Sequence, residues 1–214
     1  MKTQHYMIII LLFCVILSSV LSGCLMKTDS IIVDGLERTY CIHVPKGFDE
    51  DTSVPLVLVF HGGGGNARNI QETTSFNQKA DEEGFLVVYP QGSGTLQNHL
   101  LTWNAGFCCA YAYENSIDDV SFIKELVNHL KAQYTINDSR IYATGISNGG
   151  IMTYRLGAEL SDIFAAIAPV AASIGGQPTE NESLWCIPEL MNPVSVIVFH
   201  GTNDTRVPYE GGRP

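Results

Sequence analysis

The feature that most constrains the fold is a regular alternation between short apolar runs and longer segments with helical spacing. Each run is apolar at successive positions, which is typical of strands that are buried on both faces. The runs occupy residues 56–60, 85–89, 141–144, 165–170 and 194–199. Because strands that alternate with helices usually pair in parallel, the pattern predicts an α/β fold with a mostly parallel sheet flanked by helices.

Three segments between or beside these runs have helical spacing. The clearest covers residues 118–134, where apolar side chains recur on one face and Ser116 or Asp118 can cap the start. Residues 69–83 show a weaker helical pattern, and residues 147–160 show one that begins directly at the end of a strand. We therefore expect three helices packed against the sheet.

Two further segments have their own signatures. An Asp-Gly pair lies between two β-rich runs in residues 28–47, which predicts a hairpin that leads into the sheet. Residues 91–115 have no periodicity and are too long for a plain connection. We expect this loop to lie over the carboxyl ends of the strands, where α/β sheets bind ligands.

Residues 1–23 differ in composition from the rest and resemble a bacterial lipoprotein signal. Lys2 supplies a positive charge, an apolar stretch follows, and small residues precede Cys24. We expect cleavage before Cys24, lipidation of its thiol, and a chain that is extracellular and anchored to the membrane. An ordinary secretory signal or an uncleaved anchor is the alternative. Residues 24–214 are then long enough for a single domain.

Charge and cysteine content bear on two other classes of site. The net charge is −10, with 22 acidic and 12 basic residues, so no basic patch is available for a phosphate backbone and no nucleic-acid partner is expected. The folded part contains Cys41, Cys108, Cys109 and Cys186. Their spacing does not suit a zinc site, whereas an oxidising compartment favours disulfides, for which three pairings are possible. A bridge from the vicinal pair to Cys41 or Cys186 would hold the long loop.

The strongest local motif is Gly-Ile-Ser-Asn-Gly at residues 145–149, between a strand pattern and a helical pattern. In this context the serine occupies a strained turn, and small neighbours let its hydroxyl project into a site. The start of the helix adds a positive partial charge that favours an oxyanion. The motif alone is common, but its position identifies Ser147 as the candidate nucleophile.

A glycine run, residues 62–65, follows His61 at the end of the first buried strand. Acyl transfer needs two backbone N–H groups aimed at the tetrahedral oxygen, and glycine allows the chain to approach closely. We expect the amide of Asn148 to be one donor of this oxyanion hole and the amide of Gly63 or Gly64 to be the other. A phosphate-binding loop is the alternative, but its G-x-x-x-x-G-K-[ST] pattern is missing.

Asp204 follows the last apolar run, in a short polar loop. In α/β-hydrolases the chain order is nucleophile, acid, histidine, and the acid lies in a loop after a late strand. Asp204 is therefore the candidate catalytic acid, which would orient and stabilise an imidazole. The alternative is that its carboxylate only bonds the backbone amides of its own turn.

Taken together, these motifs resemble the secreted esterases that are grouped as polyhydroxybutyrate depolymerase-like and feruloyl or acetylxylan esterase-like enzymes, carbohydrate esterase family 1 in the broad sense. The matching segments are residues 38–40 with 44–45, 61–66, 89–92, 103–106 with 108–109, 118–120 with 122–123, 140–150, 165–171 and 200–209. The resemblance implies an α/β-hydrolase fold and ester hydrolysis without a metal or organic cofactor, through an acyl-enzyme on Ser147. It also implies ester substrates on polysaccharide or polyester. Trp103 in the long loop is a candidate to stack on a sugar or aromatic acid, with a core anchor as the alternative.

The family pattern also implies a catalytic histidine after Asp204, and none follows it in the sequence. We therefore expect residues 24–214 to be an incomplete, C-terminally truncated α/β-hydrolase domain that lacks the last strand and helix, with the base beyond Pro214. The rival hypothesis is a catalytically inactive surface homologue that keeps the cleft to bind polysaccharide or polyester.

Overall fold

The computed structural model describes residues 28–96 and 98–212. The expected signal, residues 1–23, and the expected lipidation site Cys24 lie outside the described residues. No helix within the described ranges is long and apolar enough to cross a membrane.

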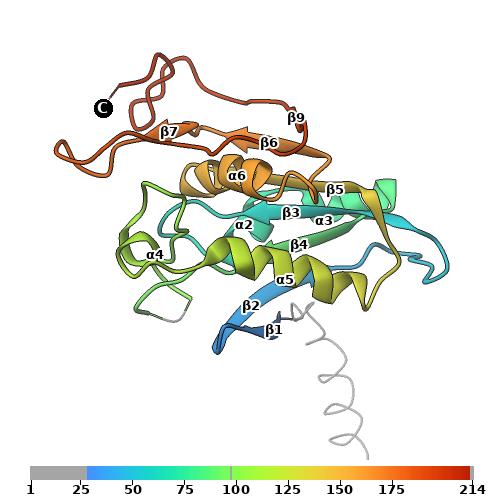
Figure 1. Ribbon diagram of the computed structural model, residues 1–214. Coiled ribbons are helices and arrows are strands. Elements are labelled where there is room, and N and C mark those ends of the chain that lie inside the picture. The colour runs from blue at the N-terminus through green and yellow to red at the C-terminus, as the bar shows by residue number, and fades with distance from the viewer. Residues whose placement is uncertain (1–27, 97, 213–214) are drawn as a thin grey trace, which may run out of the picture.

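A seven-stranded sheet forms the centre of the molecule (Figure 1). In chain order its strands are β1 (Thr28–Val33), β2 (Leu36–His43), β3 (Val54–Phe60), β4 (Leu86–Pro90), β5 (Ile136–Ile146), β6 (Ala166–Val170) and β9 (Ser195–Val196). They lie in the order β1-β2-β4-β3-β5-β6-β9. The pairs β1·β2 and β2·β4 are antiparallel and the other pairs are parallel, which confirms the predicted mostly parallel sheet.

The predicted hairpin is β1 and β2, which pair in register from Thr28↔Cys41 to Val33↔Leu36. Its turn is Asp34-Gly35, with φ of 50° and 79°. Both angles are positive, as a tight two-residue hairpin turn requires, and Asp-Gly is one of the few pairs that accept them. Local sequence therefore specifies this part of the fold.

Helices cover both faces of the sheet (Figure 1). On one face lie α5 (Asp119–Lys131) and α6 (Asn148–Glu159), which share a buried cluster with β3 and β5. On the other lie α2 (Ala67–Thr73) and α3 (Phe76–Glu83), which share a smaller one with β4. The predicted helix at 118–134 is confirmed as α5, and that at 147–160 as α6.

The single helix expected over residues 69–83 is instead two helices, α2 and α3. The break falls at Thr74 and Ser75. The Thr74 hydroxyl donates to the carbonyl of Ile70 (2.8 Å), and its extended backbone ends α2. Threonine and serine hydroxyls compete for backbone groups in this way, which outweighs a weak helical pattern.

The carboxyl-terminal part also differs from the prediction. Of the apolar run 194–199 only Ser195–Val196 is a strand, and the side chains expected to be buried are exposed, for example Ile197 (57%) and Phe199 (53%). The physical reason is that β9 lies at the sheet edge with β6 as its only neighbouring strand among the described ones. A small hairpin of β7 (Gly175–Gly176) and β8 (Trp185–Cys186) and the short α4 (Ala110–Glu114) were not predicted.

Candidate active site

Three motif-bearing segments end side by side at the carboxyl edge of the sheet. The register pairs Phe60 with Gly145, Ile146 with Val170, and Val170 with Phe199. The glycine loop, the serine turn and the loop with Asp204 begin directly after these positions. Parallel pairing thus brings segments that are far apart in the sequence to one edge, where α/β sheets place their ligand sites.

Ser147 occupies the strained turn that the motif predicts. Its φ is 55° and its ψ is −122°, and α6 begins at the next residue. Its N–H donates to the carbonyl of Val170 (2.9 Å), and its side chain is exposed. A positive φ is unusual for a residue other than glycine and is retained only where the surroundings enforce it.

The flanking glycines make this turn sterically possible. A Cβ on Gly145 would lie 2.5 Å from the Gly149 carbonyl oxygen, and one on Gly149 would lie 2.6 Å from the Phe60 carbonyl oxygen. Both distances are too short for real atoms, so the turn and the neighbouring strand β3 pack in direct backbone contact. The spacing of small residues in the motif therefore reflects packing against β3 as well as access to Ser147.

The glycine loop lies against the serine turn. A Cβ built on Gly62 would be 3.6 Å from the Ser147 Cβ, and one on Gly63 would be 3.5 Å from the Asn148 Cβ. Of the two alternatives for the second oxyanion donor, Gly63 is the more available, because the N–H of Gly64 already donates to the carbonyl of Leu101 (2.8 Å). The amides of Gly63 and Asn148 have no acceptor among the described residues.

His61 fixes the start of this loop. Its Nδ1 donates to the carbonyl of Gly62 (2.8 Å), and its Nε2 accepts from the N–H of Gly92 (3.0 Å), which defines a neutral ring. Burial lowers the pKa of His61 to about 4, so the ring stays neutral near neutral pH. Both ring nitrogens are occupied, and His61 is a structural residue here.

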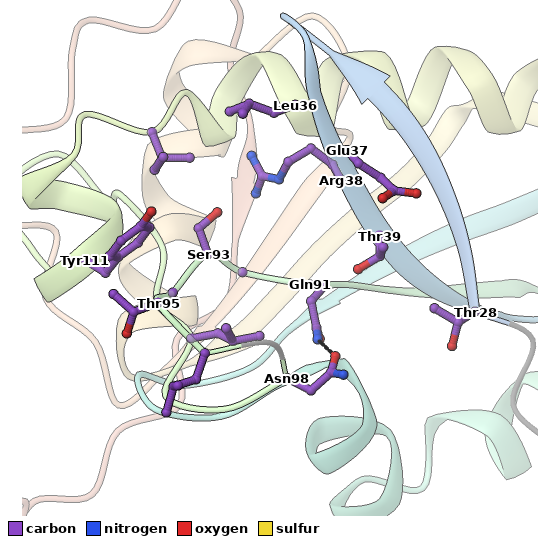
Figure 2. A pocket seen from close by; sticks show the side chains of 15 residues that line it. Thr28, Leu36, Glu37, Arg38, Thr39, Gln91, Ser93, Thr95, Asn98 and Tyr111 are labelled. Carbon is purple, nitrogen blue, oxygen red and sulfur yellow. Dashed lines mark hydrogen bonds between the residues drawn. The ribbon is translucent and has the colours of Figure 1, made fainter.

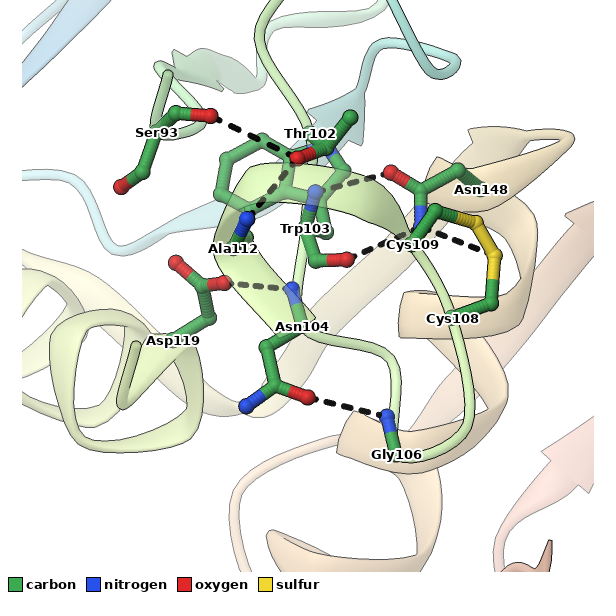
Figure 3. The surroundings of a disulfide bond; sticks show 10 residues. All are labelled: Ser93, Thr102, Trp103, Asn104, Gly106, Cys108, Cys109, Ala112, Asp119 and Asn148. Atoms are coloured by element: carbon green, nitrogen blue, oxygen red, sulfur yellow. Dashed lines mark hydrogen bonds between the residues drawn. A yellow bond between two sulfur atoms is a disulfide. The ribbon is translucent and has the colours of Figure 1, made fainter. Parts of the chain in front are cut away.

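Asn148 connects the serine turn to the long loop (Figure 3). Its side-chain oxygen accepts from the N–H of Trp103 (2.8 Å), and its side-chain nitrogen donates to the carbonyl of Trp103 (3.0 Å). The Trp103 indole N–H in turn donates to the carbonyl of His61 (3.0 Å). One buried network therefore links the residue after the nucleophile to the glycine loop.

Trp103 is fully buried (0% exposed) and packs against Phe60 and His61. A side chain that is buried in this way cannot stack on a substrate, so the interpretation of Trp103 as a stacking residue is corrected. Its burial favours the alternative, a core anchor.

The long loop next to Trp103 is held by a buried ion pair, in which Asp119 bonds Arg38 and also accepts from the N–H of Asn104 (2.7 Å). The long loop thus covers the carboxyl edge, as predicted.

Cys108 and Cys109 are joined to each other as a vicinal disulfide, and Cys41 and Cys186 are free (Figure 3). The expected bridge to Cys41 or Cys186 is therefore wrong. Cys41 belongs to the cluster under α2 and α3, whereas Cys108 packs against the cluster under α5 and α6. The sheet separates the two side chains.

Asp204 lies in the loop that follows Phe199. Its Oδ1 accepts from the N–H groups of Arg206 (2.8 Å) and Val207 (2.9 Å), and its Oδ2 is 3.6 Å from Nε2 of His200. The bonds from the Val207 and Arg206 amides lower the pKa of this carboxyl, so it is ionised at neutral pH. The turn-stabilising alternative is therefore observed, and the role of Asp204 as catalytic acid stays a prediction.

None of the histidines in the described ranges hydrogen-bonds Ser147. His200 Nε2 donates to the carbonyl of Val207 (2.7 Å), His43 bonds Asp81 (2.8 Å), and His129 bonds Gln133 (2.7 Å). The described residues also contain no group of three or more His, Cys, Asp or Glu side chains that could hold a metal ion.

A protein-family model described as "Esterase PHB depolymerase" matches residues 38–184, which include the glycine loop, the long loop and the serine turn. This is well over half of the chain. The chain belongs to the PHB depolymerase esterase family.

The names of two similar proteins, an esterase and a depolymerase, are consistent with this family. Feruloyl esterase B of Piromyces equi is 30% identical over 175 residues, which are 82% of this chain and 31% of that protein. Poly(3-hydroxyalkanoate) depolymerase C of Paucimonas lemoignei is 33% identical over 130 residues, which are 60% of this chain and 30% of that protein. The chain thus spans about a third of the length of each of these relatives.

Solved structures confirm the α/β-hydrolase fold of this PHB depolymerase-type chain. A thermostable esterase superimposes with a TM-score of 0.58 at 22% identity, over 87% of this chain and 48% of the other. Acetyl xylan esterase from Aspergillus awamori superimposes with a TM-score of 0.56 at 16% identity, over 74% of this chain and 57% of the other.

Sequence reasoning missed how the side chains of Asn148 and Trp103 and the backbone carbonyl of His61 act together in this esterase-family chain. Each residue lies in a motif, but nothing in the spacing shows that they share one network. Chemically, the arrangement offers an exposed serine hydroxyl beside two unpaired amides, that of Gly63 in the glycine loop and that of Asn148 at the start of α6. Such a site can stabilise negative charge on an oxygen held between Gly63 and Asn148.

Proposed function

We propose that this chain carries the nucleophile portion of a carboxylic ester hydrolase of the PHB depolymerase, feruloyl or acetylxylan esterase type. The observation that carries the proposal is the exposed Ser147 at a φ of 55°, with the unpaired amides of Gly63 and Asn148 beside it. Family membership over residues 38–184 supports the same reaction class.

In the proposed reaction the Ser147 hydroxyl attacks the ester carbonyl, and its proton goes to a base. The carbonyl oxygen becomes an oxyanion held by the amides of Gly63 and Asn148. Collapse expels the alcohol and leaves an acyl group on Ser147, which water then removes by the reverse sequence. Each missing amide donor typically costs on the order of 10² in rate.

We infer that the base is a histidine outside the described residues, oriented by Asp204. Two observations support this inference. The ring nitrogens of His61 and the Nε2 of His200 already have hydrogen-bond partners, and no described histidine bonds Ser147. The ionised carboxylate of Asp204, at the same edge as Ser147, suits the task of holding an imidazole.

Hydrolysis of p-nitrophenyl butyrate tests the proposal. We expect release of p-nitrophenol above the buffer rate, and loss of that excess in Ser147→Ala. Ser139→Ala is the matched control, because Ser139 is an exposed serine near the opposite end of the same strand β5. An excess rate that survives in Ser147→Ala would contradict the role of Ser147. A rate that stays at the buffer level in the unmodified chain, even when added imidazole supplies a base, would favour the inactive binding homologue.

We also propose that the chain is exported and anchored through a lipid on Cys24. The support is the sequence of residues 1–23, with Lys2 before an apolar stretch and small residues before the cysteine. In a bacterium that processes lipoproteins, we expect labelled palmitate to enter the wild-type chain and the Cys186→Ser control. It should not enter Cys24→Ser, and equal labelling of all three would refute the anchor.

A further inference from the structure

One peptide group connects Asn148 to a buried carboxylate on another helix (Figure 3). It is the peptide group between Trp103 and Asn104. Its carbonyl accepts from the side-chain nitrogen of Asn148 (3.0 Å) and from the N–H of Cys109 (3.1 Å), and its N–H donates to Oδ2 of Asp119 (2.7 Å). Because a peptide group is planar and stiff, a change at its N–H end also moves its carbonyl end. Asp119 is thus connected to the residue whose amide forms the predicted oxyanion hole.

The neighbouring backbone groups of this segment are held by side chains as well. The N–H of Trp103 donates to the side-chain oxygen of Asn148 (2.8 Å), and the carbonyl of Asn104 accepts from Nη1 of Arg155 (2.7 Å). Asn148 and Arg155 both belong to α6, whereas Asp119 belongs to α5. Asp119 therefore fixes this segment, and with it the start of α6, relative to α5.

Capping of α5 does not account for the carboxylate at position 119. The N-cap is the preceding residue, Asp118, whose Oδ1 accepts from the N–H of Ser121 (2.9 Å). The side chain of Asp119 is fully buried (0% exposed) and bonds the long loop instead. Burying a carboxylate costs free energy unless charged and hydrogen-bonding partners surround it. The partners of Asp119 therefore indicate what this buried charge does.

Arg38 of β2 balances the charge of Asp119. Its Nη2 bonds Oδ1 of Asp119, and its guanidinium lies 4.0 Å from the centre of the Phe122 ring. The Arg38 side chain lies at the wall of a cavity that the long loop also lines (Figure 2). Burial raises the pKa of Asp119, whereas the guanidinium lowers it and so favours the charged carboxylate. The ion pair therefore links β2, α5 and the long loop.

We propose that Asp119 is a positioning residue for ester hydrolysis, which holds the amide of Asn148 in the oxyanion hole through the peptide group between Trp103 and Asn104. The inference rests on the proposed function. A carboxylate is a stronger acceptor than a neutral amide oxygen, and hydrogen bonds in a chain polarise one another. The charge on Asp119 therefore strengthens the bond from Asn148 to the carbonyl of the same peptide group.

Asp119→Asn tests the inference because it keeps the size of the side chain and removes its charge. Asp118→Asn is the matched control, since asparagine also caps a helix. With imidazole added as base, we expect kcat for p-nitrophenyl butyrate, per folded molecule, to fall about tenfold in Asp119→Asn through misplacement of the oxyanion amide, with KM unchanged. Asp118→Asn should keep both constants. A merely structural role would reduce the amount of folded protein and leave kcat per folded molecule unchanged.

A double-mutant cycle tests the route through Asn148. If Asp119 acts through this side chain, Asp119→Asn should lower kcat much less in the Asn148→Ala background than in the wild type. An equal fall in both backgrounds would overturn the inference.

Hydrogen exchange of the backbone amides provides a readout that does not need turnover. In Asp119→Asn the amides of Asn104 and Trp103 should both exchange faster, because a displaced peptide group also weakens the bond between Trp103 and Asn148. Faster exchange at Asn104 alone would contradict the inference. If the unmodified chain does not hydrolyse the ester even with imidazole, the proposed function fails, and hydrogen exchange alone decides whether Asp119 positions Asn148.

An active chain in which Asp119→Asn and Asp118→Asn have equal kcat would refute the role of Asp119 and leave the proposed function intact. If Asp119→Asn does not fold, as judged by circular dichroism, Arg38→Gln replaces it. Without the guanidinium the buried carboxylate favours its neutral form, so kcat should again fall with KM unchanged. An unchanged kcat in Arg38→Gln would then overturn the inference.

Discussion

The side chain of Asn148 pairs with both backbone polar groups of Trp103, at 2.8 Å to the N–H and 3.0 Å to the carbonyl. Asn148 directly follows the candidate nucleophile, and it is buried together with Trp103. The residue that offers an oxyanion amide thus also anchors the loop that covers the site. This dual use makes the stability of the loop and the geometry of the oxyanion hole depend on one side chain.

Asn148→Ala should therefore destabilise the fold and slow ester hydrolysis. The substitution leaves the buried N–H of Trp103 without a partner, whereas the carbonyl of Trp103 still accepts from the N–H of Cys109 (3.1 Å). The free energy of unfolding should therefore fall by about 1 to 3 kcal/mol. We expect kcat for p-nitrophenyl butyrate to fall with little change in KM. Urea unfolding and steady-state kinetics measure both effects.

Asn128→Ala is the control for this substitution, because Asn128 is exposed on α5. Its effect on the free energy of unfolding should be within about 0.5 kcal/mol. Equal losses in the two variants would contradict the anchoring role of Asn148.

The buried ring of His61 predicts a specific pH dependence of stability. Burial lowers its pKa from 6.5 to about 4 in the folded chain. Between these values the unfolded chain binds a proton that the folded chain does not. The free energy of unfolding should therefore decrease as the pH falls from 6.5 to 4, by about 3 kcal/mol from this group, with no contribution above that range.

His61→Gln tests this dependence because glutamine keeps one donor and one acceptor but does not titrate. Urea unfolding from pH 4 to 7 should show a shallower decline in His61→Gln than in the wild type. His99→Gln, in the exposed part of the long loop, should retain the wild-type slope. Identical slopes in the wild type and His61→Gln would disprove the assignment.

Two glycines provide a matched test of the packing at the serine turn. A Cβ on Gly149 would lie 2.6 Å from the Phe60 carbonyl oxygen, whereas a Cβ on Gly201 would meet nothing within 4 Å. Gly149→Ala should cost about 1 to 3 kcal/mol through overpacking. Gly201→Ala should stay within about 0.5 kcal/mol of the wild type in thermal or urea unfolding. A tolerated Gly149→Ala would mean that the turn does not pack against β3.

Added imidazole should increase hydrolysis by the chain if the base lies outside the described residues. A small imidazole can replace an absent histidine as general base for an exposed serine hydroxyl. The increase, corrected for the direct reaction of imidazole with the ester, should vanish in Ser147→Ala. An equal increase in both proteins would show that Ser147 takes no part.

The sequence predicted the parts of the fold that depend on local pattern. The Asp-Gly hairpin, α5 with its Asp118 cap, and the serine turn at the start of α6 all follow from periodicity, turn chemistry and capping, and the structure has them. The break between α2 and α3 escaped prediction because a weak helical pattern hides the competing hydroxyl of Thr74.

Tertiary contacts account for the features of the fold and of the candidate site that the sequence did not predict. The partners of Asn148 and His61 lie many residues away in the chain, so no spacing rule indicates them. The disulfide prediction was wrong because Cys41 and Cys108 project into clusters on opposite faces of the sheet. The exposure of Phe199 follows from its place at the sheet edge, which periodicity does not reveal.

The central claim is that Ser147 is the nucleophile of an ester hydrolase, and trapping the acyl group tests it most directly. After brief exposure to p-nitrophenyl butyrate and acid quench, peptide mass spectrometry should find the butyryl group on the peptide that contains Ser147. Ser139→Ala should give the same adduct and Ser147→Ala should give none. Butyrylation of other residues alone, or an adduct that persists in Ser147→Ala, would contradict the account.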